Sequence, residues 1–283
     1  MKHLIIFILS INIAQAKYNK AVYEPEDNRL NINEISNTMF IEYSKTIFAK
    51  IDPDLLKTDD GELYEIMGKP IGKYRHMCKD AKFYNEPMAS SCTGFLVSKD
   101  ILLTAGHCNS QEKKCDGSSW VLGFTSENKF IEKDKLFKCK KILAHETDLA
   151  KRRDYTLIKL DREVTGIKPL TLRRKGNVNK KDELALLGHP SGLPLKVASS
   201  GYIRSNNKKN AYFTTTLDSF HGNSGSPVIN TRTGLVEGIL TQGEEDYEID
   251  YVRNCRKVKV CKTTECRGED VTKISIVPFK LIK

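Results

Sequence analysis

The sequence predicts an all-β protein built from short antiparallel strands. Apolar-rich runs recur along the chain, and Gly, Pro, Asn and Asp, the residues that turns favour, separate them. Short strands punctuated in this way are typical of antiparallel sandwiches and barrels. The runs are Gly94–Val97, Ile101–Ala105, Trp120–Phe124, Tyr155–Leu160, Leu184–Leu187, Gly201–Ile203, Tyr212–Leu217, Pro227–Ile229 and Val236–Thr241.

The first sixteen residues have the composition of a secretory signal. Lys2 precedes the apolar run Leu4–Ile13, and Ala14-Gln15-Ala16 is a small-x-small cleavage site. The apolar run is shorter than the roughly 20 residues that a membrane-spanning helix needs. We therefore expect residues 1–16 to be removed, and the mature protein to be secreted or periplasmic with no membrane partner.

One helix is expected before the first strand. Ile35, Met39, Tyr43 and Ile47 recur at intervals of four residues, which predicts an amphipathic helix that ends before Pro53. We expect this helix to pack on the flank of the β-structure rather than to bind a membrane.

The charge of the chain is positive, with a formal net charge of +10. A basic surface can favour acidic partners such as nucleic acid. The lysines and arginines are scattered along the chain, however, and no aromatic platform or Gly-rich RNA-binding signature accompanies them. We expect a solvated basic surface, no nucleic-acid partner and a monomer.

Eight cysteines in an exported chain favour disulfide bonds. Cys115 and Cys139 lie in neighbouring segments and could pair. A zinc site is the alternative for the pair Cys261 and Cys266, but a second ligand pair is missing from the nearby sequence. Four cysteines would otherwise form two bridges in an order that the sequence leaves open: Cys78, Cys255, Cys261 and Cys266.

The segment Phe220–Pro227 places a serine within a glycine-rich turn. A hydroxyl is a poor nucleophile unless a base takes its proton and hydrogen-bond donors receive the charge that develops on the attacked carbonyl. Glycines allow a tight turn, so the backbone N–H groups of Gly222 and Ser224 can point at one oxyanion. Taken alone, this pattern also describes an ordinary turn.

Two upstream motifs resolve that ambiguity. Leu103–Cys108 contains Thr-Ala-Gly-His-Cys, and Asp154–Leu160 places an aspartate at the edge of an apolar strand. With the Gly-x-Ser-Gly-x-Pro motif around Ser224, these motifs make the chain from about residue 90 to 243 resemble the trypsin/chymotrypsin family of serine peptidases.

The resemblance implies a chymotrypsin-like fold of two packed six-stranded antiparallel β-barrels. His107 and Asp154 would lie in the first barrel and Ser224 in the second, with Cys92 bonded to Cys108. The segment Val22–Arg29 resembles the mature start of the compact bacterial glutamyl-endopeptidase branch. The expected divisions are a short propeptide at 17–21, an N-terminal extension with the helix at 22–70, the first barrel at 71–170, and the second barrel with a cysteine-containing C-terminal segment at 171–283.

The resemblance also assigns the catalytic roles. Ser224 would attack the substrate, His107 would act as the base, and Asp154 would hold the imidazole in the required tautomer. Asp148 and Asp161 lack the following strand motif and are interpreted as surface charges. This chemistry requires neither a metal nor an organic cofactor.

The pocket motifs predict cleavage of protein or peptide substrates after Arg or Lys. Asp218 matches the acidic floor of the specificity pocket in trypsin-type members. A cationic side chain would offset the desolvation of such a carboxylate. Glutamyl-specific relatives carry a histidine on the wall strand, where Leu240 is the nearest match. The other expected substrate-binding residues are Ser219, His221, Thr241, Gln242 and Gly243.

Two alternatives remain open at this point. One is a glutamyl-specific serine endopeptidase, which the N-terminal similarity favours. The other is a catalytically inactive binding protein on the same scaffold, although all three triad residues are present. Asn223 also differs from the aspartate that vertebrate-type members use to bind a newly formed N-terminus, so any maturation must proceed differently.

Overall fold

Strands dominate the computed structural model, as the sequence predicts, and the described residues contain only two α-helices. The structure describes residues 22–23, 27–109, 111, 113–148, 150–262 and 266–282. The expected signal at 1–16 and propeptide at 17–21 lie outside the described residues. Within these ranges, no helix is long and apolar enough to cross a bilayer.

The first barrel is closed by six antiparallel strands in the order β10-β12-β13-β9-β8-β3. Trp120, Leu102 and Ile158 belong to the buried cluster that fills its interior. The strands are β3 (Ile47–Ile51), β8 (Ser90–Ser98), β9 (Ile101–Thr104), β10 (Ser119–Leu122), β12 (Leu136–Asp148) and β13 (Arg153–Leu160).

The second barrel is also closed by six strands, because β14 pairs with both β17 and β15. β2 (Leu30–Asn31) pairs with β15 at the edge. The six strands are β14 (Glu183–Gly188), β15 (Lys196–Ser205), β16 (Tyr212–Thr215), β17 (Pro227–Asn230), β18 (Val236–Gln242) and β22 (Glu269–Lys273). The loop 231–235 joins β17 to β18, and Gly234 N donates to Asn230 O at 2.8 Å.

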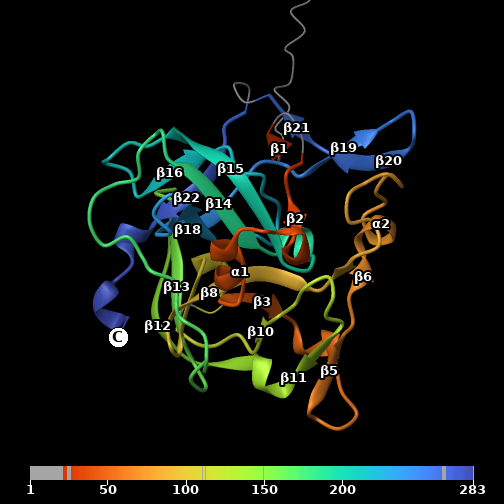
Figure 1. Ribbon diagram of the computed structural model, residues 1–283, viewed down its shortest axis with the longest axis horizontal. Helices are drawn as coiled ribbons and strands as arrows, with labels where there is room; N and C mark the ends of the chain where they lie inside the picture. Colours follow the sequence, from red (N-terminus) through yellow and green to blue (C-terminus); the bar gives the residue numbers. More distant parts are fainter. Residues whose placement is uncertain are drawn as a thin grey trace, which may run out of the picture.

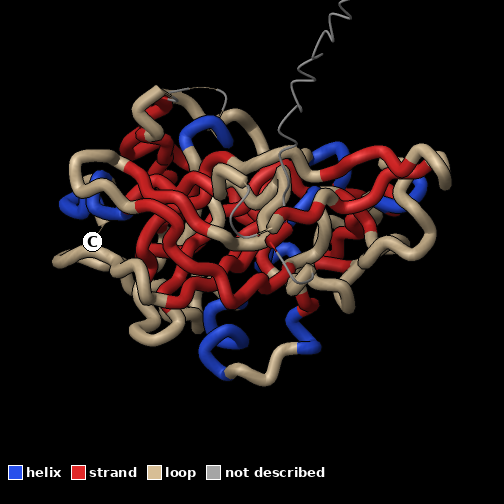
Figure 2. The backbone as a smooth tube through the Cα atoms, turned by 90° about the horizontal axis from the view of Figure 1, so that it is seen from above, coloured by secondary structure: helices blue, strands red, loops and turns tan. Residues whose placement is uncertain are grey.

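The two barrels pack against each other through one shared core. Phe95 and Leu103 of the first barrel lie in the same buried cluster as Leu187 and Ile239 of the second. Figure 1 shows the second barrel above the first, and Figure 2 shows that strands form most of the body of the molecule, with several of the helical segments around its edge. Two rigid barrels in contact can hold side chains from distant segments at a common boundary.

The N-terminal helix is shorter than the sequence predicts. α1 spans Thr38–Ser44, begins where the Asn37 side chain accepts a hydrogen bond from Met39 N, and buries Phe40. Its Tyr43 hydroxyl donates to Gly234 O at 2.9 Å, so the helix packs on the β17–β18 hairpin as expected. The helix predicted from the four-residue apolar spacing was wrong beyond Ser44. Ile47 is the first residue of β3, which pairs with both β8 and β10.

This finding also corrects the boundary drawn at residue 70. β3 is an integral strand of the first barrel, so the segment 22–70 is not an extension separate from it. Small sheets of two or three strands lie beside the barrels. Three are pairs: β1 (Val22–Tyr23) with β21 (Val260–Cys261), β6 (Lys69–Pro70) with β7 (Pro87–Met88), and β19 (Tyr247–Asp250) with β20 (Cys255–Val258). In the fourth, β5 (Leu63–Ile66) lies between β4 (Leu56–Lys57) and β11 (Phe130–Glu132). The second helix, α2, spans Ile71–Tyr74.

Four disulfide bonds link the described residues. Cys92 is bonded to Cys108, as the family resemblance implies, and Cys115 to Cys139, the pairing that the sequence left possible. The order that the sequence left open is Cys78 to Cys255 and Cys261 to Cys266. The bond between Cys261 and Cys266 occupies both sulfurs, so the zinc alternative at this pair was wrong.

Candidate active site

His107 and Asp154 are brought together by two paired strands. His107 lies in the turn that directly follows β9, and Asp154 is the second residue of β13, which pairs with β9. The imidazole Nδ1 lies 2.6 Å from Asp154 Oδ2, and the backbone N–H of His107 donates to Oδ1 at 2.8 Å. The carboxylate is 1% exposed. Because the carboxylate accepts the Nδ1 proton, the free ring nitrogen is Nε2, the atom that can accept a proton from a substrate-facing hydroxyl.

Gly106, the residue before His107, leaves room for the Asp154 carboxylate to approach the imidazole. A Cβ on Gly106 would lie 2.2 Å from Glu146 O and 2.6 Å from Asp154 Oδ1. Any larger residue would push the carboxylate away from the imidazole. The glycine of the Thr-Ala-Gly-His-Cys motif therefore has a steric reason to precede His107.

Ser224 is held at the boundary between the barrels. Its carbonyl accepts a hydrogen bond from Thr93 N of β8 at 2.8 Å, and Gly225 N donates to Leu240 O of β18 at 2.8 Å. Gly225 has φ +91°, and a Cβ there would lie 2.0 Å from Thr93 O. The serine is thus fixed to both barrels, and it lines the same cavity of about 410 Å³ as His107.

The turn before Ser224 presents backbone donors. Gly222 has φ +94°, and its carbonyl accepts the Thr93 hydroxyl proton at 3.0 Å, which orients this peptide group. Among the described residues, the N–H groups of Gly222 and Ser224 have no hydrogen-bond partner within the protein. Asn223 is buried and packs its amide oxygen toward Gly188 of β14. Two backbone donors beside Ser224 are therefore left without a protein partner.

Six expected substrate-binding residues line the cavity together with His107 and Ser224. They come from the turn before the serine and from β18 with the residue that follows it: Ser219, His221, Leu240, Thr241, Gln242 and Gly243. The backbone N–H of His221 donates to Asp246 Oδ2 at 3.0 Å, which holds the rim of the cavity to the loop after β18. Burial, followed by the charges of Arg75 and His107, lowers the pKa of His221.

Asp218 is the exception, and its expected position on the pocket floor was wrong. It does not line the cavity. Its carboxylate is fully buried and accepts hydrogen bonds from Tyr23 N at 2.8 Å and Asn28 N at 2.9 Å. Burial raises the pKa of Asp218 to about 6. Asp218 therefore anchors the N-terminal segment to the second barrel.

A different carboxylate lies in the cavity. Glu269, the first residue of β22, is fully buried and lines the cavity. Its Oε2 accepts the Ser219 hydroxyl proton at 2.8 Å, and Oε1 accepts Glu244 N at 3.3 Å. A Cβ on Gly243 would lie 2.0 Å from Oε2, so the absence of a side chain there leaves room for the carboxylate. Burial raises the pKa of Glu269 well above its usual value.

Further acidic residues surround Glu269 in the same cavity. Glu244, Glu245 and Asp246 follow β18 directly and line the wall. Burial raises the pKa of Asp246 to about 6. Cations from outside the cavity pair with two of these acids, Lys259 with Glu245 at 2.7 Å and Arg267 with Glu244 at 3.6 Å. The cavity is therefore rich in carboxylates.

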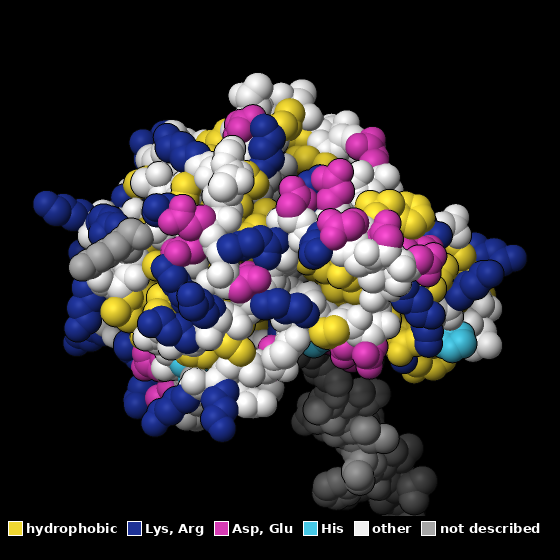
Figure 3. Space-filling model, turned by 90° about the horizontal axis from the view of Figure 1, so that it is seen from below, with side chains coloured by type: hydrophobic (Ala, Val, Ile, Leu, Met, Phe, Trp, Pro, Cys, Tyr) yellow, Lys and Arg dark blue, Asp and Glu magenta, His cyan; other side chains and the backbone are white. Residues whose placement is uncertain are grey.

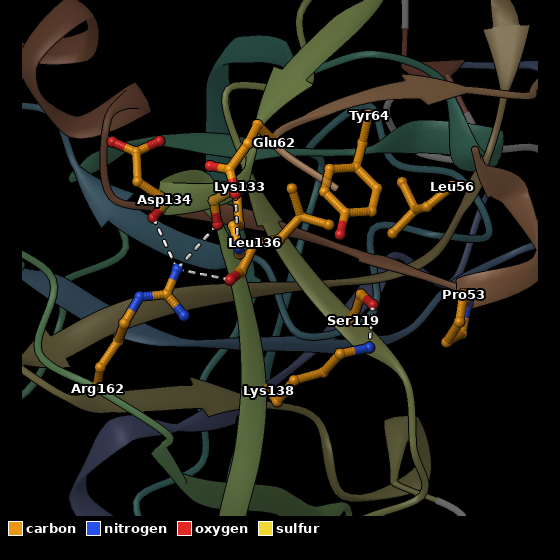
Figure 4. Close-up of a pocket in the computed structure, with 10 residues that line it drawn as sticks. All are labelled: Pro53, Leu56, Glu62, Tyr64, Ser119, Lys133, Asp134, Leu136, Lys138 and Arg162. Atoms are coloured by element: carbon orange, nitrogen blue, oxygen red, sulfur yellow. Dashed lines mark hydrogen bonds and ion pairs between the residues drawn. The ribbon is translucent and has the colours of Figure 1, made fainter. Parts of the chain in front are cut away.

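A second cavity, of about 580 Å³, lies on the first barrel and contains none of the expected site residues. Arg162 Nη2 donates to three backbone carbonyls there, and Lys138 Nζ donates to Ser119 Oγ at 2.7 Å (Figure 4). Lys133 pairs with Glu62 at 2.7 Å. Because these cations already have partners, their arrangement is that of a structural brace.

The surface charges are mixed. Lysine and arginine side chains are spread over the face in Figure 3, with acidic side chains between them. The distribution on this face agrees with the expectation of a solvated basic surface.

Comparisons with known proteins agree with this geometry. The model of a family described as the trypsin-like peptidase domain matches residues 92–239. No curated protein matches the chain significantly in sequence.

Several solved structures share the fold at low sequence identity. A protease from M. tuberculosis in its active form is 13% identical, with a TM-score of 0.51, covering 94% of this chain and 92% of its own. A Glu endopeptidase is 14% identical, with a TM-score of 0.50, covering 92% of this chain and 97% of its own. The VesB protease of Vibrio cholerae is 13% identical, with a TM-score of 0.52, covering 89% of this chain and 65% of its own.

Proposed function

Because the chain belongs to the trypsin-like peptidase domain family and is a serine endopeptidase, we propose that Ser224, His107 and Asp154 form its catalytic triad. The observation that carries this assignment is the 2.6 Å contact between His107 and the buried Asp154 carboxylate, beside the cavity that Ser224 also lines. The residues occur on three segments far apart in the sequence. Their convergence supports a catalytic rather than an incidental arrangement.

The proposed reaction proceeds through an acyl-enzyme. His107 Nε2 takes the proton from the Ser224 hydroxyl as Oγ attacks the carbonyl carbon of the peptide bond. Asp154 stabilises the imidazolium, and the N–H groups of Gly222 and Ser224 stabilise the oxyanion. His107 then gives the proton to the leaving amine, the C–N bond breaks, and water releases the acyl group by the same steps.

The acidic cavity supports a preference for substrates with Arg or Lys before the scissile bond. In this proposal Glu269, rather than Asp218, is the carboxylate that binds the cationic side chain. A buried carboxylate gains most from a cationic partner, which compensates for its desolvation. A glutamate side chain would instead meet Glu269, Glu244 and Asp246 in one cavity, and this repulsion disfavours the glutamyl-specific alternative.

The proposal includes export of the protein. Four disulfides fit an extracellular or periplasmic setting, and the signal expected at residues 1–16 supports the same location. N-terminal sequencing of the active protein tests this part, because a start at residue 17 or 22 agrees with it and retention of residues 1–16 does not.

The test of the catalytic assignment is the variant Ser224→Ala, with Ser226→Ala as its matched control. Ser226 is a buried serine two residues away in the same turn. We expect Ser224→Ala to lower kcat by about 10⁵- to 10⁶-fold, while Ser226→Ala keeps its turnover within about tenfold of the wild type. Equal activity in Ser224→Ala and the wild type would refute the assignment. A wild-type protein that neither cleaves peptides nor reacts with an organophosphate would favour the alternative of an inactive binding protein.

A further inference from the structure

A long connection separates two barrel strands that pair with each other. β3 and β8 are antiparallel neighbours, yet residues 52–89 lie between them. Hairpin loops usually hold about two to five residues, and much longer connections usually serve a function. This connection carries β4 to β7 and α2, and the Cys78–Cys255 disulfide ties it to the β19–β20 hairpin.

The connection forms a wall of a groove of about 640 Å³. Ser90 and Ser91 at the start of β8 form another part, and Ser191 and His221 contribute from the second barrel. His221 also lines the catalytic cavity. The groove and the catalytic cavity therefore meet at this residue.

The position of the groove relative to the scissile bond follows from its lining. Residues 240–243 line the catalytic cavity but not the groove. In the proposed function, the side chain before the cut enters the cavity that residues 240–243 and Glu269 line, so the groove, which shares only His221 with this cavity, is available to the chain after the cut. Ser91 adjoins Cys92, whose disulfide to Cys108 places this end of the groove beside His107.

The chemistry of the groove differs from that of the catalytic cavity. Lys50 is paired with Asp116 at 2.5 Å, and Lys69 lies 5.3 Å from the centre of the Tyr74 ring. Among the described residues, neither Lys69 nor Arg75 has a carboxylate partner within ion-pair distance, and the other acid of the lining, Asp52, accepts a hydrogen bond from Asp54 N at 3.0 Å. Apolar side chains also line the groove: Leu55, Met67, Tyr74 and Met88.

Arg75 lies close to the junction with the catalytic cavity. Its positive charge is, after burial, the next largest cause of the lowered pKa of His221. Beyond His221, the groove carries three cations and two acids: Lys50, Lys69, Arg75, Asp52 and Asp116. The lining of the catalytic cavity contains acids, among them Glu269 and Asp246, but no lysine or arginine.

We propose that this groove binds the substrate segment that follows the scissile bond and selects apolar and acidic residues there. The inference rests on the proposed peptidase function and defines a substrate class. These substrates are peptides with a basic residue before the cut and an apolar residue followed by Asp or Glu after it. Lys69 and Arg75 would favour the carboxylate, and the apolar wall of the connection would bind the preceding side chain.

The experiment compares three quenched fluorescent peptides that are identical up to an arginine before the cut. Leu-Asp, Leu-Asn or Leu-Lys follows the cut. A small-alcohol ester of the same acyl part, which does not reach the groove, is the fourth substrate. We expect kcat/KM to fall from Asp to Asn to Lys by about threefold to fivefold at each step, which is the range for partly exposed ion pairs.

Charge reversal identifies the residues responsible. We expect the double variant Lys69→Glu/Arg75→Glu to prefer the Lys peptide over the Asp peptide. Lys57→Glu is the matched control, because Lys57 is an exposed lysine of the same connection that does not line the groove. It should keep the wild-type order of the peptides and the wild-type turnover of the ester.

The two levels of the proposal fail in different ways. Equal kcat/KM for the three peptides, with efficient turnover of the ester, would overturn the groove inference and leave the peptidase function intact. A double variant that keeps the wild-type order would overturn the roles of Lys69 and Arg75. No turnover of any of the four substrates by the wild type would refute the proposed function itself.

Discussion

Replacing Glu269 by Gln separates the role of this carboxylate in specificity from its role in the fold. Glutamine has nearly the same shape and retains an oxygen that can accept the Ser219 hydroxyl or the Glu244 N–H. The substitution therefore removes the ability to carry a negative charge at a fully buried position while it leaves the packing almost unchanged.

The expected effect on catalysis is large. Removing one member of a buried charge pair typically costs about 2–5 kcal/mol, so kcat/KM for arginine substrates should fall by about 10²- to 10³-fold. A substrate with citrulline, the neutral isostere of arginine, should be nearly insensitive to the change. The ratio of kcat/KM for arginine over citrulline is the assay, because it cancels effects common to both substrates.

Stability should change in the opposite direction. The pKa of Glu269 is raised in the folded state, so the unfolded chain loses this proton first as pH rises above about 4.5. Ionisation then favours the unfolded state, and this contribution to stability falls with rising pH until Glu269 itself ionises. Glu269→Gln should therefore unfold at an equal or higher temperature than the wild type near pH 8.

The control is Glu245→Gln, a cavity residue whose side chain is 72% exposed. We expect it to change the arginine-to-citrulline ratio by less than about fivefold, because an exposed charge is screened by solvent. If Glu269→Gln keeps the wild-type ratio, Glu269 does not recognise the substrate cation and the reasoning is wrong.

Two further predictions concern the other buried carboxylates. Asp154→Asn should lower kcat by about 10⁴-fold with little loss of folding, because an amide can stabilise the wrong tautomer of His107. Steady-state kinetics measures kcat, and circular dichroism checks the fold. A fall in kcat of less than about tenfold would contradict the prediction. Asp218→Asn should leave the arginine-to-citrulline ratio unchanged. Because the pKa of Asp218 is raised to about 6 in the folded state, the wild type should lose stability relative to this variant by up to about 3 kcal/mol as pH rises from about 4 to above 6. Urea denaturation at both pH values tests the sign, and a wild type that gains stability relative to the variant as pH rises would contradict it.

The triad candidates could be predicted because each is carried by a local motif. Asp154 sits at the start of an apolar strand, His107 follows another, and glycines surround Ser224. These patterns require specific residues for steric reasons, as the contact of a Gly106 Cβ with Glu146 O shows. The local sequence around each residue is therefore sufficient to identify the three triad candidates.

The identity of the pocket carboxylate could not be predicted in the same way. Glu269 reaches the cavity through the register of β22 against β18, where Val271 is opposite Leu240. β22 contains the buried charged residues Glu269, Asp270 and Lys273, so it lacks the apolar pattern that identifies a strand. The residue that matches the family's pocket floor is instead Asp218, which the N-terminal segment covers.

Two strands of the first barrel were missed for different reasons. β3 continues the four-residue apolar spacing of α1, and only its pairing with β8 and β10 distinguishes it from helix. β12 is half exposed along most of its length and is interrupted by register shifts, so its residues do not alternate cleanly. Both segments form strands because they pair with other strands of the first barrel.

The central claim is that Ser224 is activated by His107 and Asp154 across the boundary between the two barrels. Labelling with an organophosphate, followed by peptide mapping, tests it directly because only an activated serine reacts rapidly. We predict stoichiometric modification of Ser224 in the wild type and at least a 10³-fold slower reaction in His107→Ala. Modification at another serine, or an equal labelling rate in His107→Ala, would contradict the account.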